Sequence, residues 1–113
     1  MARSVDLLRG TLDLLILKTL TWRPAHGYAI ARWIEQLTGE VPVIAEGSLY
    51  PALHRLEERG FVESKWELSD TGRRTKVCHL NARGRAQVRA ESASWKQFVH
   101  AVSQVLDAKA QPA

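Results

Sequence analysis

Four side chains in the segment 46–60 are of types that suit a polyanion. They lie off the apolar face with which their helix would pack on the core. The segment reads EGSLYPALHRLEERG, and its leucines repeat at i, i+4 and i+7, which is the spacing of one apolar helix face. The residues off this face are Ser48, Tyr50, His54 and Arg55. Hydroxyl groups can donate to phosphate oxygens, and an arginine can bind a base edge with two hydrogen bonds. The pattern therefore predicts that these four side chains contact DNA.

Each of these residues also has a simpler role available. Tyr50 could pack on a neighbouring helix, Arg55 could pair with Glu58 three residues later, and His54 could be an ordinary surface residue. We place DNA contact first for Tyr50 because the leucines already fill the core face, and we leave open whether Arg55 reads a base. Ser48 is expected to cap the helix, whose unpaired N–H groups would also suit a phosphate.

A second group of basic residues follows the turn formers SDTG at positions 69–72. The flanking stretches FVESKWEL and RRTKVCHL alternate as strands do, so they predict a β-hairpin with Arg73, Arg74 and Lys76 at or just beyond its tip. The stretch 71–90 holds six basic residues and no acidic one. Arginine carries its charge on a long arm that can follow a phosphate backbone or enter a minor groove. We therefore predict that this hairpin also binds DNA.

The rest of the chain reads as helices that would position these two groups. We expect a helix at 7–20 with two apolar sides, a one-sided helix ending near Leu37, and a Pro-broken connector at 40–46. A last helix is predicted at 82–107 with Asn81 as its cap. Three helices, the third short, followed by a hairpin form the order of a winged helix-turn-helix. The predicted fold class is mainly α with a β-hairpin wing and a long C-terminal helix.

The last helix is about 39 Å long at 1.5 Å per residue, which exceeds what one small domain can cover. We therefore expect a homodimer, with a winged helix-turn-helix domain at 1–80, a dimerisation helix at 81–107 and a disordered tail at 108–113. The first helix would share in the dimer interface. The residues assigned to the dimer interface are Leu8, Leu12, Leu15, Trp95, Phe98, Val99, Val102, Val105 and Leu106.

Composition and motif content argue against several other classes. The net charge of +4 permits a polyanionic partner, while one cysteine and four scattered histidines predict no disulfide, no metal site and no cofactor. Neither a Gly-rich phosphate loop nor a nucleophile or paired-carboxylate motif is present, so we expect no enzyme. The apolar run 12–20 is too short to span a membrane and includes Asp13 and Lys18. We expect a cytoplasmic protein.

Three motifs together resemble one family of bacterial regulators. They are HGYAI, GSLYPALHRLEERGFVES and GRRTKVCHLNARGR, and the likeness to the PadR family extends over residues 8–107. The resemblance implies a winged-helix repressor of the short-tailed branch that dimerises through its N-terminal and C-terminal helices. It also implies that the motif tyrosine and arginine are Tyr50 and Arg55, and that the wing basics are Arg73, Arg74 and Lys76. Val77 and Cys78 stand where many members carry tyrosines.

The resemblance further implies a role for Trp95. Some members sense phenolic or planar aromatic compounds between such helices, so Trp95 could line an effector site, although we favour a simple interface anchor. The expected function is a repressor that binds double-stranded DNA at a pseudo-palindromic operator as a homodimer, with release by a small aromatic ligand as an additional expectation. The alternative is a winged-helix module for protein–protein interaction without operator specificity, against which the basic wing argues.

Overall fold

A computed structural model of the chain describes residues 2–39 and 47–112, and the side chains of residues 2–9 lie outside that description. The elements in chain order are α1 (Ala2–Leu20), β1 (Ala25–His26), α2 (Gly27–Leu37), α3 (Leu49–Glu58), β2 (Val62–Leu68), β3 (Arg74–Leu80) and α4 (Ala82–Asp107). They confirm the predicted fold class of helices, a β-hairpin wing and a long C-terminal helix. The predicted connector at 40–46 lies outside the described residues.

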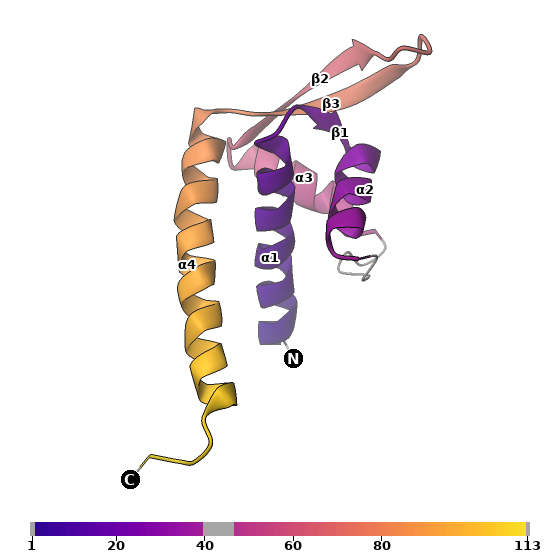
Figure 1. Ribbon diagram of the computed structural model, residues 1–113. Helices are drawn as coiled ribbons and strands as arrows, with labels where there is room; N and C mark the ends of the chain where they lie inside the picture. The colour runs from indigo at the N-terminus through magenta and orange to yellow at the C-terminus, as the bar shows by residue number, and fades with distance from the viewer. Residues whose placement is uncertain (1, 40–46, 113) are drawn as a thin grey trace.

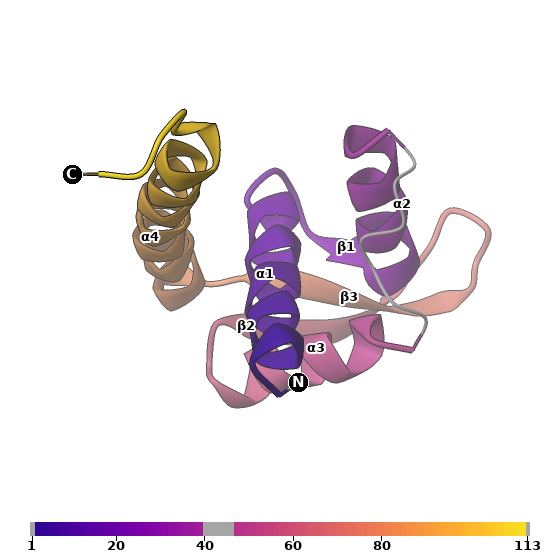
Figure 2. The same ribbon diagram turned by 90° about the horizontal axis from the view of Figure 1, so that it is seen from below.

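Helix α1 lies at the centre of the domain because its apolar residues cover more than one side. Ile16, Leu17 and Leu20 are each at most 1% exposed. Helices α2 and α3 pack on α1, and α4 runs beside it on another side, so that α1 lies between α4 and α2 (Figure 2). Ile30 of α2 and Leu56 of α3 complete the fully buried centre. The two apolar sides predicted for this helix therefore have two sets of neighbours.

Helix α3 ends at a glycine that turns the chain toward the hairpin. Gly60 has φ +81°, a conformation that glycine adopts without strain, and the Phe61 N–H donates to the Leu56 carbonyl over 3.0 Å. The start of α3 differs from the prediction. Ser48 stands at the N-cap position, but its side chain makes no capping hydrogen bond. Its backbone is helical there, whereas a capping serine normally has an extended backbone.

The hairpin forms as predicted, and a short additional strand joins it. β2 and β3 pair antiparallel with Ser64 opposite Cys78 and Leu68 opposite Arg74, and β1 pairs with the other edge of β3. A two-residue strand carries no alternating pattern, so the sequence did not predict β1. At the root of the hairpin Val62 and Cys78 are buried, while the tip projects well past the helices (Figure 1).

Helix α4 has the bounds that the sequence predicted, and its cap is present. The Gly84 N–H donates to Asn81 Oδ1 over 2.8 Å, and Asn81 Nδ2 donates to the Gly60 carbonyl over 2.7 Å. Asn81 therefore ties the start of α4 to the end of α3. Only the first turns of α4 enter the core, through Val88, and the helix then runs alongside α1 (Figure 1).

The surface assigned to the dimer interface is only partly available in the single chain. Leu12 is 7% exposed and belongs to the core, and Leu15 is half-buried against it. The side chain of Leu8 lies outside the described residues. The exposed apolar residues of α4 are Trp95, Phe98, Val99, Val102, Val105 and Leu106. Leu12 therefore packs within its own chain rather than offering a surface to a partner, whereas the stripe on α4 remains open.

Candidate DNA interface

The outer face of α3 presents Tyr50 and His54 to solvent, as the leucine spacing predicted. Tyr50 is 66% exposed. His54 Nε2 lies 3.0 Å from Glu58 Oε1, one helical turn further on, and both side chains are about two-thirds exposed. An ion pair this exposed contributes little to stability, and it forms only when the imidazole is protonated. Tyr50 and His54 can therefore give up their present contacts and bind a ligand at a small cost in free energy.

The first turn of α2 supports the Tyr50 ring. A Cβ atom on Gly27 would lie 2.9 Å from Cε1 of Tyr50, so only a glycine lets the ring rest against this turn. Tyr28 follows directly, is 67% exposed, and stacks on His26 with 6.4 Å between ring centroids. Tyr28 was not among the residues predicted to contact DNA, although its place in HGYAI at a helix start was the available signal. Two phenols therefore lie near the N-terminus of α2.

Helix α3, helix α2 and the wing share one surface. A shallow hollow of about 260 Å³ lies between them, and its lining residues are Gly27, Tyr50, Leu53, His54, Glu57, Lys76 and Cys78. Lys76 Nζ lies 3.6 Å from Glu57 Oε1, and the Ser64 hydroxyl donates to the same carboxylate. The structure thus brings Tyr50, His54 and Lys76 together, although Lys76 is paired with a carboxylate that the sequence analysis did not assign to it.

Arg55 departs from the prediction. Its Nη2 lies 2.9 Å from Oδ1 of Asp13 on α1, and Asp13 is only 6% exposed. Ala52, one turn earlier on α3, is fully buried and widens the core face toward Arg55. The guanidinium therefore compensates a buried carboxylate rather than pairing with Glu58, and 31% of the Arg55 side chain stays exposed. That Arg55 also contacts DNA stays a prediction. The signal was Asp13, a charge within an otherwise apolar helix segment.

The wing arginines are exposed and available. Among the side chains of residues 10–39 and 47–112, neither Arg73 nor Arg74 forms an ion pair with a carboxylate. Arg74 lies over the ring of Trp66, with 5.4 Å from its Cζ to the ring centroid. The tip is closed by a hydrogen bond of 2.7 Å from the Ser69 N–H to the Arg73 carbonyl. The turn therefore places the consecutive residues Arg73 and Arg74 at the end of the hairpin.

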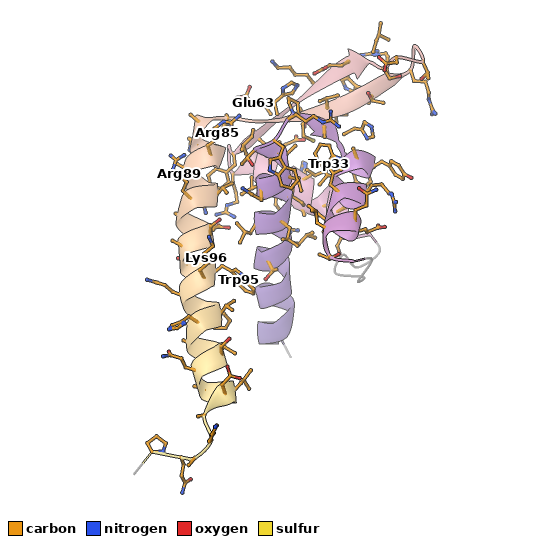
Figure 3. The ribbon with its side chains drawn as sticks, viewed as in Figure 1. Trp33, Glu63, Arg85, Arg89, Trp95 and Lys96 are labelled. Atoms are coloured by element: carbon orange, nitrogen blue, oxygen red, sulfur yellow. The ribbon has the colours of Figure 1, made fainter. Side chains whose placement is uncertain are left out.

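The basic stretch 71–90 divides into two surfaces. Three of its cations lie on the wing, while Arg83, Arg85 and Arg89 are exposed on the first turns of α4 (Figure 3). Arg83 lies over Phe61, 5.4 Å from the ring centroid. The hairpin tip and α4 extend from opposite ends of β3, so the cations at the tip and those along α4 lie on separate parts of the molecule (Figure 1).

Cys78 is a packed side chain beneath the hollow. It is 3% exposed, and burial raises the pKa of its thiol, partly offset by the Ser64 hydroxyl 3.7 Å away. A protonated thiol is a poor nucleophile, so this cysteine fills space at the hairpin root. No group of three or more potential metal ligands occurs among the side chains of residues 10–39 and 47–112. In the same part of the chain, no helix is long and apolar enough to cross a bilayer.

The apolar stripe of α4 begins at an aromatic pair. Trp95 and Phe98 lie with their ring centroids 6.0 Å apart, and Trp95 points from α4 toward α1 (Figure 3). Trp95 is 38% exposed and Phe98 48% exposed, and the exposure rises to 77% at Leu106. So many exposed large apolar residues in one stripe are unusual for an isolated chain and typical of an interface.

Comparisons with known proteins agree with this architecture. An uncharacterized protein X of Lysinibacillus sphaericus is 31% identical over 108 residues, which cover 95% of this chain and 94% of that protein. The structure of a transcriptional regulator from Clostridium thermocellum is similar with a TM-score of 0.77 at 28% identity, covering 88% of this chain and 93% of that one. A PadR family transcriptional regulator from Eggerthella lenta gives 0.75 at 29% identity, covering 96% and 92%.

The family assignment follows from a match over most of the folded domain. The model of the transcriptional regulator PadR-like family matches residues 16–90, from the centre of α1 through the wing into α4. This family and the similar structures are transcriptional regulators rather than enzymes. The chain belongs to the PadR-like family of DNA-binding transcriptional regulators.

Proposed function

We propose that this regulator binds a pseudo-palindromic operator as a homodimer and represses transcription by occupying that DNA. The observation that carries the proposal is the shared surface of α3 and the wing, where exposed Tyr50 and His54 adjoin Lys76 of the hairpin. A helix of this width fits the major groove, and a basic hairpin suits the neighbouring backbone. A protein bound there excludes other proteins from the same DNA.

Within this proposal the contacts divide by chemistry. Tyr50, and Tyr28 beside it, donate from their phenols to phosphate oxygens, and the N-terminus of α2 adds the positive end of its helix dipole. His54 lies further along α3 and faces the groove, while Ser48 contributes a hydroxyl at the start of the helix. Arg55 is left out because its guanidinium compensates Asp13.

The dimer part of the proposal rests on the stripe of α4. Packing two copies along this stripe would cover its six apolar side chains and, with Leu15 of α1, continue the core across a two-fold axis. The two copies of α3 would then meet half-sites about 34 Å apart on one face of the duplex. Trp95 would lie near the middle of that interface as an anchor. The same aromatic pair with Phe98 is where a small aromatic effector would bind between the helices.

Removing one hydroxyl from α3 tests its contact with DNA. Tyr50→Phe keeps the ring that packs against Gly27, so the free energy of unfolding should not change. We expect the affinity for a duplex selected by the protein from a random library to fall about fivefold, since one hydrogen bond contributes about 1 kcal/mol. Fluorescence anisotropy of the labelled duplex measures this. An affinity equal to that of the unmodified protein would remove Tyr50 from the interface.

Neutralising the wing tests the electrostatic part. Arg73→Ala combined with Arg74→Ala should weaken binding to all duplexes by a similar factor and lower the slope of log K against log salt by about 2 per protomer, one for each phosphate contact. The matched control is Arg85→Ala combined with Arg89→Ala, which removes the same charge from α4 (Figure 3). A loss confined to the selected sequence would instead show that the wing reads bases.

The same titrations separate the alternative function. A winged-helix module that binds only proteins would show no salt-dependent affinity for duplex DNA and would select no sequence from the library. Selection of a sequence with two-fold symmetry would exclude that alternative, and it would also supply the operator.

A further inference from the structure

The two faces of the hairpin differ in chemistry. Side chains alternate along paired strands, so Glu63, Lys65 and Glu67 share one face with His79. Glu67 Oε2 lies 2.7 Å from His79 Nε2, which gives this face a mixed and partly acidic character. Glu63 lies at the root of the hairpin (Figure 3). A face with two carboxylates would be repelled by a phosphate backbone.

The opposite face is aromatic and basic. Trp66 lies directly opposite Lys76 and Leu68 directly opposite Arg74. Trp66 is 61% exposed and Leu68 74% exposed, although both are large apolar side chains on a strand whose root is buried. Arg74 lies over the indole of Trp66. This half of the hairpin therefore exposes two apolar side chains on β2 beside two cations on β3, and we call Trp66, Leu68, Arg74 and Lys76 the wing face.

The wing face is continuous with the outer side of α3. Along the same side of β2 and β3, Ser64 and Lys76 both contact Glu57 of α3, and Cys78 lies under the hollow that Tyr50 lines. Moving outward from this root, the next side chains are Trp66 and then Leu68. A duplex in contact with Tyr50 and with the wing cations would therefore also contact Trp66.

A second copy of the chain would leave the wing face uncovered if it packs along α4. The hairpin tip projects from the domain on the side away from α4 and beyond α2 (Figure 1). Within the part of the chain that the structure describes, the Trp66 side chain is 61% exposed and lies against the Arg74 guanidinium. Charge complementarity identifies the occupant as DNA, because two cations on β3 lie beside the apolar side chains and the chain is a DNA-binding regulator.

We propose that the wing face is a DNA contact in which the Trp66 indole packs against the sugars of the minor groove and holds Arg74 toward the groove floor. Apolar side chains pack in minor grooves, and a narrow, A·T-rich groove attracts arginine. Trp66 then both contacts DNA and orients a cation through its ring. This inference rests on the proposed mode of DNA binding and adds a specificity residue that charge alone would not reveal.

Fluorine NMR of the protein labelled with fluorotryptophan tests the contact directly. The resonance of Trp66 is identified by its loss in Trp66→Phe, and a duplex from the random-library selection is then added. We expect the Trp66 resonance to shift and to lose its sensitivity to exchange of water for heavy water, because the exposed ring becomes covered. The resonance of Trp22, which is 52% exposed and lies against the Trp33 ring of α2, should keep its sensitivity.

Substitution provides the second measurement. Trp66→Ala should weaken binding at least about fivefold, in the range of one aromatic contact with a nucleotide, and should reduce the preference for A·T over G·C beside the half-site. Trp22→Ala, which removes an indole of similar exposure, should leave binding unchanged. If anisotropy shows binding while the Trp66 resonance stays solvent-sensitive, the wing face is not a DNA contact and the proposed function stands. If the duplex is not bound, both fail.

Discussion

Replacing Arg55 with alanine should lower the free energy of unfolding by about 3 kcal/mol, because it leaves the carboxylate of Asp13 buried without a partner. This loss of free energy lies at the lower end of the range for breaking a buried ion pair, because the Arg55 side chain is 31% exposed and water can reach part of the site. Urea unfolding at a fixed protein concentration measures the change. The effect should appear without any DNA present.

An exposed ion pair provides the matched control for Arg55. Arg32 Nη1 lies 3.0 Å from Glu35 Oε2 on α2, and both side chains are 40% exposed, so Arg32→Ala should cost no more than about 0.5 kcal/mol. Asp13→Leu combined with Arg55→Leu should recover most of the loss, because no charge is then left buried. A stable Arg55→Ala protein with weakened DNA binding would mean that Arg55 contacts DNA after all.

The ion pair between Arg55 and Asp13 also has a geometric consequence. It fixes α3, the helix that faces DNA in our proposal, to α1 at the centre of the domain. Since α1 lies beside α4, the pair helps to set the orientation of α3 relative to the proposed dimer axis (Figure 2). A shift of α1 against α4, from whatever cause, would therefore be transmitted to the spacing of the two α3 helices. That is the mechanical requirement for an effector between the α4 helices to change operator affinity.

Val102→Asp should separate the dimer and remove operator binding with it. Val102 lies in the middle of the α4 stripe and is 38% exposed in the single chain. In the proposed dimer two aspartates would be buried without partners, which should raise the dissociation constant at least about a thousandfold, or about 4 kcal/mol. Sedimentation or light scattering at micromolar concentration measures the mass, and anisotropy measures the DNA affinity of the same sample.

Gln104→Asp is the matched control for Val102. Gln104 is exposed two residues further along α4, on the side opposite the stripe, so the same charge there should leave both mass and affinity unchanged. The α4 stripe would be excluded as the interface if Val102→Asp stayed dimeric with normal DNA affinity. A monomer that still binds the full operator tightly would separate dimerisation from DNA binding.

Local sequence signals determined the elements of this fold. The bounds of α4, its Asn81 cap, the hairpin around residues 69–72 and the leucine face of α3 all follow from short-range patterns, and the structure has each of them. Such patterns are decisive because a cap, a turn and an apolar periodicity depend on residues within one or two turns. The exposure of Tyr50 and the two wing arginines followed from the same reasoning.

Tertiary structure decided the partners of the side chains that lie at the border of an apolar helix face or on a strand. Arg55 turns to Asp13 across 42 positions of sequence, Lys76 pairs with Glu57, and Leu12 is covered by its own chain. The wing face, too, exists only because strand register sets Trp66 opposite Lys76. Periodicity states which side of an element is apolar, but it does not state which charge lies across from it. By itself the sequence therefore determined the elements and their inner faces, and only their packing decided which polar side chains are free to meet DNA, because that depends on partners distant in the chain.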